Sequence, residues 1–289
     1  MVGYISALSG GTTADMTVRL LAAVLGLLLA AASPARADAA PRRVVTVNLC
    51  LDQFALRLAA PGQLVGVSYL ARDRRTSVLA ERARDIPTVR GTAESILDLQ
   101  PDLVVFDSVA QANVKRLVRA AGVPILELPW ARSLEEAQTS IARMAEALGR
   151  GEQGRELIES MRERERMLVR PGPPSTTAAV LHAGLLTAGK GSLTDELLAL
   201  AGYRNLAAEL GISDYGRLSL EALLAARPDI VVLDGASNDD PARATSFVDH
   251  PAIRAMARHS RIVSLPLRYA ICAGPENLDA MRILREAHP

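Results

Sequence analysis

The chain has 289 residues, of which 49% are hydrophobic and 22% are charged, and its formal net charge is +1. This length allows two domains, and this composition is typical of a folded globular protein. The even balance of charge argues against a nucleic-acid partner, because contact with the phosphate backbone requires a basic surface.

The first 37 residues have the pattern of a secretory signal peptide. A weakly basic start ends at Arg19, an apolar stretch covers residues 20–32, and Ala35-Arg36-Ala37 is a small-x-small cleavage signal. The apolar stretch is shorter than the roughly 20 residues that a membrane anchor needs. We therefore expect cleavage before Asp38 and a mature protein in the periplasm; Met16 is an alternative start of translation.

Residues 38–132 alternate between apolar runs and amphipathic runs. We expect strands at residues 42–48, 65–68, 103–106 and 123–128, and helices at residues 49–59, 77–86, 93–100 and 114–121. Such alternation indicates a mostly parallel sheet with helices on both faces. These residues are predicted to form an N-terminal α/β lobe.

Residues 133–174 show a helical pattern instead. Leu134, Ile141 and Leu148 recur at helical spacing, and Pro171-Gly172-Pro173-Pro174 ends the segment. Glycines at positions 149, 151 and 154 interrupt it. We predict one long or kinked helix between two lobes, stiff enough to limit their relative movement.

Residues 175–289 return to the strand and helix pattern. Strands are expected at residues 178–181, 230–233 and 261–265, and helices at residues 193–201, 220–227 and 275–287. The predicted fold class is therefore α/β, with two related lobes of mostly parallel sheet joined by a long helix.

A repeated motif relates the two lobes. Residues 93–107 (AESILDLQPDLVVFD) and residues 220–234 (LEALLAARPDIVVLD) are identical at seven of fifteen positions. In each copy a hydroxyl residue, Thr92 or Ser219, can cap a helix, and a proline then stops that helix. The apolar run that follows fits a strand buried on both faces. Repetition of the whole unit indicates two lobes of related structure.

The chain contains two cysteines, Cys50 and Cys272, one in each predicted lobe. In an oxidising compartment they can form a disulfide that would tie the lobes together. Two separate thiols lining a cleft are the alternative. A structural zinc site is not predicted, because such a site usually needs four closely spaced Cys and His ligands.

These features together resemble the class III substrate-binding proteins of ABC importers for iron-siderophores, haem and cobalamin. The resemblance extends over residues 42–286 and rests on the signal peptide, the two lobes, the linking helix and the motif Glu-x(6)-Pro-Asp in each lobe. It implies a monomeric binding protein with no catalysis and no cofactor. Such a protein passes its ligand to a permease dimer in the inner membrane, and the family's docking glutamates correspond to Glu94 and Glu221.

The resemblance also implies where the ligand lies. In this family the loops at the strand ends of both lobes wall the ligand, as is usual for open α/β sheets. The corresponding residues are Asn48, Cys50, Asp52, Tyr69, Arg72, Ser108, Trp130, Leu186, Tyr215, Arg268 and Tyr269. Aromatic rings suit a large chelate, and the two arginines suit an acidic one. Ordinary packing or solvation is the alternative for each residue taken alone.

Three classes of cargo or activity remain to be weighed. Asp107-Ser108 and Leu185-Leu186 stand where the family's cobalamin pockets have rings, so we expect an iron-siderophore ahead of cobalamin or haem. A binder of bare divalent ions would need several His, Asp or Glu ligands, of which only His182 is near the predicted cleft. The remaining alternative, a secreted enzyme, is disfavoured because the sequence has neither Gly-x-Ser-x-Gly nor His-Glu-x-x-His.

Overall fold

The structure is a computed structural model that describes residues 40–109, 111–234, 251 and 256–288. The predicted signal peptide at residues 1–37 lies outside this part of the chain. Within the described part, no helix is both long enough and apolar enough to cross a bilayer.

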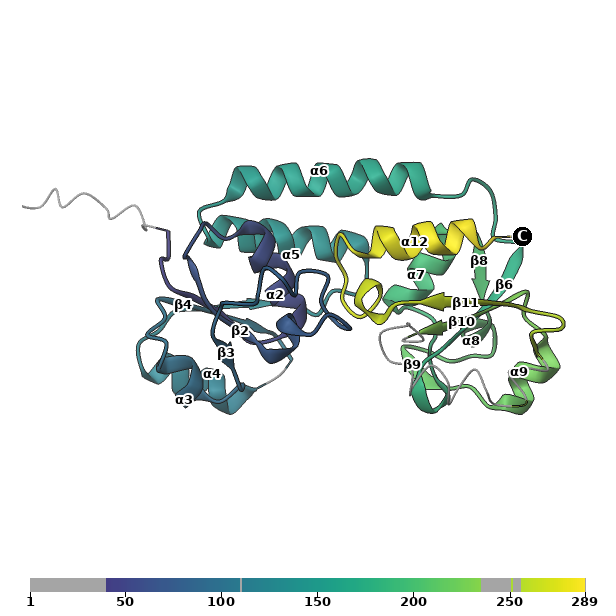
Figure 1. Cartoon of the computed structure of the whole chain (residues 1–289), viewed down its shortest axis with the longest axis horizontal. Coiled ribbons are helices and arrows are strands. Elements are labelled where there is room, and N and C mark those ends of the chain that lie inside the picture. The colour runs from purple at the N-terminus through teal and green to yellow at the C-terminus, as the bar shows by residue number, and fades with distance from the viewer. Residues whose placement is uncertain (1–39, 110, 235–250, 252–255, 289) are drawn as a thin grey trace, which may run out of the picture. The chain divides into compact units, whose positions relative to one another are not determined.

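The N-terminal lobe, which we call lobe one (residues 40–132), is built on a five-stranded parallel sheet in the order β3-β2-β1-β4-β5 (Figure 1). Its strands are β1 (Val44–Thr46), β2 (Leu64–Ser68), β3 (Thr88–Val89), β4 (Leu103–Asp107) and β5 (Ile125–Leu128). β1 and β4 are neighbours, with Val44 opposite Leu103 and Thr46 opposite Val105. The chain order reverses direction across the sheet at this pair of strands.

Helices cover both faces of this sheet. One face packs against α2 (Leu49–Leu58) and α5 (Leu134–Ala147), and the other packs against α3 (Ala93–Leu97) and α4 (Ala112–Ala120). The strands are therefore continuous apolar runs, because neither face of a parallel sheet meets water.

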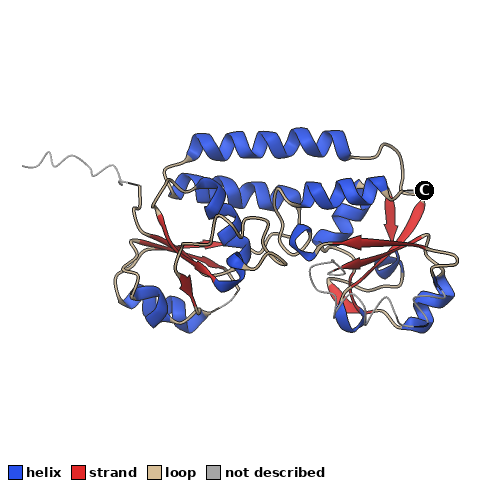
Figure 2. Cartoon of the chain, viewed as in Figure 1, coloured by secondary structure: helices blue, strands red, loops and turns tan. Residues whose placement is uncertain are grey.

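Lobe two (residues 175–288) has a four-stranded parallel sheet in the order β11-β10-β6-β8 and a separate antiparallel pair, β7 and β9. Its strands are β6 (Thr176–Leu181), β7 (Leu186–Ala188), β8 (Tyr203–Asn205), β9 (Tyr215–Arg217), β10 (Ile230–Asp234) and β11 (Arg261–Leu265). Its helices are α7 (Leu193–Leu200), α8 (Leu206–Glu209), α9 (Leu220–Ala226) and α12 (Asn277–Glu286). α7 and α12 cover one face of the larger sheet, and α8 and α9 cover the other. Short 3-10 turns also occur in the two lobes: η1 (Tyr69–Arg72), η2 (Ala183–Leu185) and η3 (Leu267–Tyr269). The predicted α/β class with two parallel-sheet lobes is thus confirmed (Figure 2).

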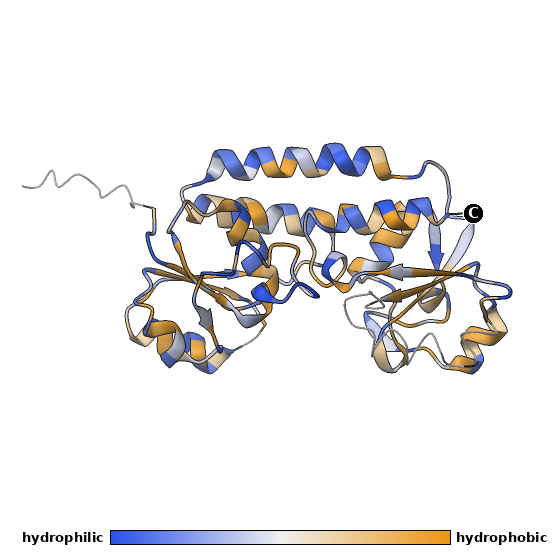
Figure 3. Cartoon of the chain, in the orientation of Figure 1, coloured by the Kyte–Doolittle hydropathy of each residue, from blue (hydrophilic) through white to orange (hydrophobic). Residues whose placement is uncertain are grey.

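The prediction of one long or kinked linking helix over residues 133–174 is wrong, because the segment forms two separate helices. Two helices, α5 and α6 (Gly151–Leu168), pack against each other, and α6 also packs against α12 (Figure 1). The chain reverses at Gly149, whose φ of +69° is available to glycine at little cost. Gly154 allows the close return, because a Cβ there would lie 2.4 Å from the Cβ of Ala145. α6 is largely hydrophilic, as expected for a solvated face (Figure 3).

Residues 77–86 form a series of turns and not the predicted helix. Arg72 donates from Nε to the carbonyl of Ala83 at 3.3 Å, and its Nη2 donates to the carbonyl of Ile86. Both carbonyl groups are among the last four of the segment, which a helix ending at residue 86 would leave without an internal partner. Arg72 therefore binds the end of this segment.

The repeated motif has the same local structure in both lobes. Thr92 accepts a bond from the Ser95 N–H at 3.2 Å, and Ser219 accepts one from the Ala222 N–H at 3.1 Å, so both predicted caps are confirmed. After each proline comes a buried strand, β4 or β10. The repeat therefore encodes one structural unit used twice.

Candidate functional site

A cavity of about 570 Å³ lies between residues of lobe one and residues of lobe two. Its lining from lobe one comes from the start of α2, the end of β4 and the segment after β5; its lining from lobe two comes from the start of α7, the start of β9 and the segment before α12. Five of the predicted ligand-binding residues are among those that line it: Asn48, Cys50, Ser108, Trp130 and Tyr215.

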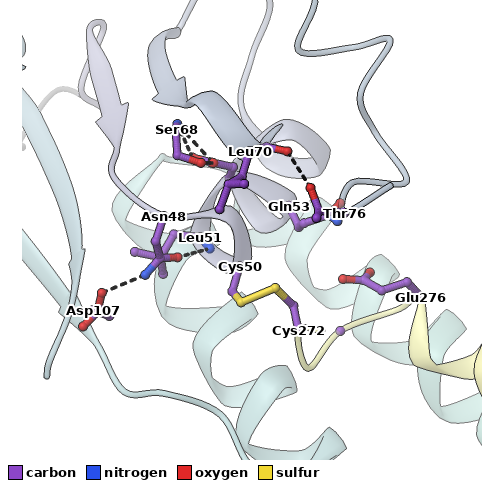
Figure 4. The surroundings of a disulfide bond; sticks show 12 residues. Asn48, Cys50, Leu51, Gln53, Ser68, Leu70, Thr76, Asp107, Cys272 and Glu276 are labelled. Atoms are coloured by element: carbon purple, nitrogen blue, oxygen red, sulfur yellow. Dashed lines mark hydrogen bonds between the residues drawn. A yellow bond between two sulfur atoms is a disulfide. The ribbon is translucent and has the colours of Figure 1, made fainter. Parts of the chain in front are cut away.

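The polar part of the lobe-one wall stands where β1 and β4 end. Asn48 caps α2 by accepting from the Leu51 N–H at 3.0 Å, and its Nδ2 donates to Asp107 Oδ2 at 2.8 Å (Figure 4). Asp107 Oδ1 also accepts from the Val109 N–H at 3.0 Å. These bonds fix an amide and a carboxylate at the reversal point of the sheet, which is where open α/β sheets bind ligands.

Two exposed aromatic rings border the cavity from opposite lobes. Trp130 follows β5 and is 52% exposed, and Tyr215 begins β9 and is 62% exposed. Large apolar groups are normally buried, so two exposed rings at one cavity are surfaces available for contact. Further apolar lining comes from Leu51, which lies within the predicted lobe-one wall at residues 48–52, and from three residues that were not predicted: Phe54, Leu193 and Ile271.

An ion pair spans the two lobes at the same cavity. Arg132 Nη2 lies 3.0 Å from Asp214 Oδ1, and both residues line the cavity. Both side chains are about half exposed, so the pair is screened by solvent and contributes little stability. Asp214 has a φ of +53°, a left-handed conformation that aspartate tolerates better than most residues. Neither residue was predicted, because an isolated charge in a loop gives no sequence signal.

A disulfide joins Cys50 of α2 to Cys272 of lobe two, with the two Cα atoms 5.3 Å apart (Figure 4). Of the two alternatives that the sequence left open, the structure contains the bonded one. Both cysteines line the cavity, so the cystine is part of its wall.

Asp52 does not line the cavity, although its position suggested that it would. Its carboxylate is fully buried in lobe one, where Oδ1 accepts from Thr46 Oγ1 and Oδ2 accepts from Ser68 Oγ, each at 2.5 Å. Burial raises the pKa of Asp52 to about 7, against the bonds from Ser68 and Thr46, which lower it. Asp52 thus ties α2 to the sheet and does not face a ligand.

Five other predicted residues are also absent from the described lining of the cavity: Tyr69, Arg72, Leu186, Arg268 and Tyr269. The Tyr69 side chain is 67% exposed. Arg72 binds carbonyl groups of its own loop, as described above. The Arg268 guanidinium lies 5.1 Å from the centroid of the Tyr269 ring, so these two residues contact each other. Sequence position placed each residue in a loop near a strand end but could not give the direction of its side chain.

The structure offers no site for a bare metal ion within the described residues, where no group of three or more His, Cys, Asp or Glu side chains comes together. His182 follows β6, and its backbone N–H donates to the Leu186 carbonyl at 2.8 Å. It is not part of the described cavity lining.

Glu94 and Glu221 occupy equivalent, exposed positions outside the cavity. Each is the second residue of its helix, α3 or α9. The pKa of Glu221 is lowered, first by a hydrogen bond from the backbone N–H of Glu221 to its own carboxylate and second by a hydrogen bond from the Ser219 side chain. α3 and α9 lie on the side of the two lobes that is opposite to α6 (Figure 1).

Comparison with known families gives one match over most of the chain. The family model described as periplasmic binding protein matches residues 44–268. The relatives that match are named as binding proteins, and one of them is named as the substrate-binding lipoprotein of an ABC transporter; this confirms the prediction of a binding protein and not an enzyme.

Individual relatives have low sequence identity to this chain, but the matches extend over most of its length. A cobalamin-binding protein of Halobacterium salinarum is 25% identical over 73% of the chain, and the match spans 58% of that relative's length. An ABC transporter substrate-binding lipoprotein of Bacillus subtilis is 22% identical over 86% of the chain and 80% of its own length. The solved structure of the haem-binding protein RhuT from Roseiflexus has a TM-score of 0.69 and 26% identity, and the match covers 85% of this chain and 98% of RhuT.

Proposed function

We propose that the chain, which belongs to the periplasmic binding protein family, is exported, captures one metal chelate between its lobes and delivers it to an ABC importer. The observation that carries this proposal is the cavity of about 570 Å³ walled by both lobes and bordered by Trp130 and Tyr215. That volume is within the range of roughly 300 to 1,000 Å³ that is usual for small-molecule sites.

The charge of the cavity indicates the kind of chelate. Among its described lining residues Arg132 is the one cation, and it is bound to Asp214, whereas Asp107 is a second carboxylate at the same cavity. A ferric catecholate or the two propionates of haem would bring negative charge to this wall without an available cation. An uncharged ferric hydroxamate avoids that cost, because a buried charge requires a partner. We therefore place a neutral iron-siderophore first.

Cobalamin is the second candidate cargo. The relative from Halobacterium salinarum is named a cobalamin-binding protein, and a corrinoid carries amide side chains that can bond to Asn48, Asp107 and Ser108. Its broad ring could contact Trp130 and Tyr215.

Haem is the third candidate. RhuT is named a haem-binding protein, and the phenol of Tyr215 is a group of the kind that can ligate haem iron. The two negative propionates of haem count against haem, because the one cation among the described lining residues, Arg132, is bound to Asp214.

Delivery is assigned to Glu94 and Glu221. Both residues are exposed at the starts of α3 and α9, and these two helices lie on the side of the lobes opposite to α6. Carboxylates form charge-assisted, two-pronged bonds with arginine. Two such contacts, one per lobe, would set the orientation of the binding protein on a permease dimer.

The test is a fluorescence titration of the purified protein. Trp130 is the one tryptophan in the sequence and borders the cavity, so bound chelate should quench its emission. The panel contains ferrichrome as the neutral hydroxamate, a ferric catecholate, haem, cyanocobalamin and zinc chloride. Saturable quenching by ferrichrome or cyanocobalamin supports the proposal; saturation by zinc alone, or by nothing in the panel, contradicts it.

A further inference from the structure

Two links between the lobes start from one face of α2. Cys50 and Arg57 are seven residues apart on this helix, which places them two turns apart on the same side. Cys50 is bonded to Cys272, and Arg57 Nη2 lies 3.0 Å from Glu276 Oε2. Both partners belong to the segment of residues 272–276, which leads into α12. α2 and this segment are thus held by a covalent bond at one end and an ion pair at the other.

The segment that receives these links is itself rigid. Asn277 is fully buried and donates from Nδ2 to the carbonyls of Tyr269 and Cys272, each at 2.9 Å. Its Oδ1 accepts from the Gly274 N–H at 2.6 Å. A Cβ at Gly274 would lie 3.0 Å from Glu276 Oε1, so a side chain there would press against that carboxylate. The cystine and the ion pair therefore act on a preformed loop.

The ion pair that accompanies the cystine is buried. The Glu276 side chain is not exposed at all and the Arg57 side chain is 15% exposed. Arg57 Nη1 also donates to the Gln53 carbonyl at 2.8 Å and to Gln53 Oε1 at 3.2 Å, so the guanidinium is held in place by α2. Separation of the two lobes here would leave a buried carboxylate without its cation, which is costly.

The two links face two different cavities. Cys50 and Cys272 line the cavity of about 570 Å³, whereas Arg57 and Glu276 line a smaller cavity of about 250 Å³. The contact between α2 and residues 272–276 is therefore the wall that separates the two.

We infer that the Cys50–Cys272 cystine is the fixed floor of the ligand site, where it contacts the bound ligand and holds the lobes at a constant distance. The ligand contact rests on the proposed function; the restraint on the lobes does not. Because the cystine keeps the lobes together on its side of the cavity, the lobes move apart for ligand entry at the exposed pair Arg132 and Asp214, which links them more weakly.

Bound ligand should protect the Cys50–Cys272 cystine from a reductant. A dithiol such as dithiothreitol reduces a cystine when one of its thiolates attacks a cystine sulfur to form a mixed disulfide; its second thiol then releases the other cysteine. Two electrons and two protons pass to the cysteines, and the dithiol leaves as a cyclic disulfide. Cys272 is only 2% exposed, so attack must come through the cavity onto the more accessible Cys50. A ligand that rests on the cystine blocks this approach.

The first arm of the test measures the rate at which dithiothreitol liberates thiols, with and without saturating ferrichrome or cyanocobalamin, whichever quenches Trp130. Ligand should slow reduction at least about tenfold, because the fraction of unoccupied protein falls as ligand concentration exceeds Kd. The same compound at a concentration too low to bind serves as the control. An unchanged rate with Trp130 fully quenched would remove the cystine from the ligand site.

The second arm needs no ligand and so remains decisive if the proposed function fails. Hydrogen exchange is followed in α2 and in residues 269–277 for the oxidised protein, for the same sample after reduction, and for the double variant Cys50→Ser/Cys272→Ser. Amides at this contact should exchange at least about tenfold faster without the bond, because exchange reports local opening. Reoxidation of the reduced sample, which should restore slow exchange, controls for misfolding of the variant. Equal exchange in all three states would overturn the restraint.

Discussion

At the scale of single residues, Tyr215 is the exposed ring that lobe two contributes to the cavity, opposite Trp130 of lobe one. An exposed ring gains the most from a bound ligand, because contact removes its apolar surface from water. Its position at the start of β9, next to Asp214, also places it beside the ion pair that spans the lobes.

We expect Tyr215→Ala to weaken ferrichrome or cyanocobalamin binding by about 1 to 3 kcal/mol, the range for loss of a buried aromatic contact. Quenching of Trp130 gives the dissociation constant. Tyr69→Ala is the matched control, because Tyr69 is equally exposed but lies outside the described cavity lining. Equal affinities for wild type and Tyr215→Ala would remove this ring from the site.

Protonation of Asp52 should make the free energy of unfolding depend on pH. Burial raises its pKa from 3.8 to about 7 in the folded protein. Between about pH 4 and pH 7 the folded chain therefore keeps a proton that the unfolded chain has lost. The free energy of unfolding should fall as pH rises through this window and level off above it, by at most about 1.4 kcal/mol per pH unit from this group.

Urea unfolding at pH 4.5 and pH 7.5 measures this effect in wild type and in Asp52→Asn. The variant should lose the part of the pH dependence that Asp52 contributes, while the contributions of all other groups remain. Identical pH dependence in the two proteins would show that Asp52 does not titrate in this window.

At the scale of elements, the aspartate that follows the proline in each repeat binds backbone N–H groups at the start of a neighbouring strand. The sequence repeat alone did not predict this contact. Asp102 accepts from the N–H groups of Arg42 and Arg43 at 2.7 and 2.8 Å, just before β1. Asp229 accepts from the Thr177 N–H at 2.7 Å, within β6. In both lobes the aspartate that precedes one strand thus fixes the start of its neighbour.

Asp229→Ala should lower the free energy of unfolding by about 0.5 to 1.5 kcal/mol, because it removes an exposed hydrogen bond to the Thr177 N–H. Asp229→Asn keeps an acceptor oxygen and should cost less. Chemical denaturation of the two variants checks this. Equal losses would mean that the charge of Asp229, and not its hydrogen bond, is what stabilises lobe two.

The elements themselves were largely predictable, because buried parallel strands and capped helices leave direct patterns in the sequence. The linker was not. Helical periodicity says where a helix runs but not where the chain reverses, and the signal for the reversal was the interruption by glycines at positions 149, 151 and 154. Turns replace the helix expected at residues 77–86, and Arg72 from outside that segment binds carbonyl groups at its end.

The site was predictable only in part for a similar reason. Asn48, Ser108 and Trp130 follow strands whose ends meet at the cavity, so chain order alone brings them there. The direction of a side chain is a different matter. Asp52 points into lobe one, Arg72 points toward its own loop, and Arg132 was missed because nothing in the sequence pairs it with Asp214.

At the scale of the whole molecule, three features serve one task. The cystine and the pair Arg57–Glu276 join the lobes beside the cavity, α6 packs against helices α5 and α12, and helices α3 and α9, which carry Glu94 and Glu221, lie on the side opposite to α6. Under the proposed function, a receptor whose lobes are held in this way would present Glu94 and Glu221 at a fixed spacing, which would suit recognition by a symmetric permease.

Replacement of both carboxylates, Glu94→Lys with Glu221→Lys, should abolish chelate uptake in cells that depend on this protein, because like charges would oppose the permease arginines. Affinity for the chelate should stay at the wild-type value. Glu156→Lys with Glu163→Lys places the same charge change on exposed positions of α6 and should leave uptake intact. Lost chelate affinity in the first pair would instead place these glutamates in the ligand site.

The measurement that tests the central claim most directly is a calorimetric titration of the oxidised protein with ferrichrome, its iron-free form, cyanocobalamin and zinc chloride. One site per chain with a submicromolar Kd for an intact metal chelate, and no heat from zinc or from the iron-free form, is the predicted result. Binding of zinc alone, or of none of the four and not of haem either, would contradict the account of a chelate receptor.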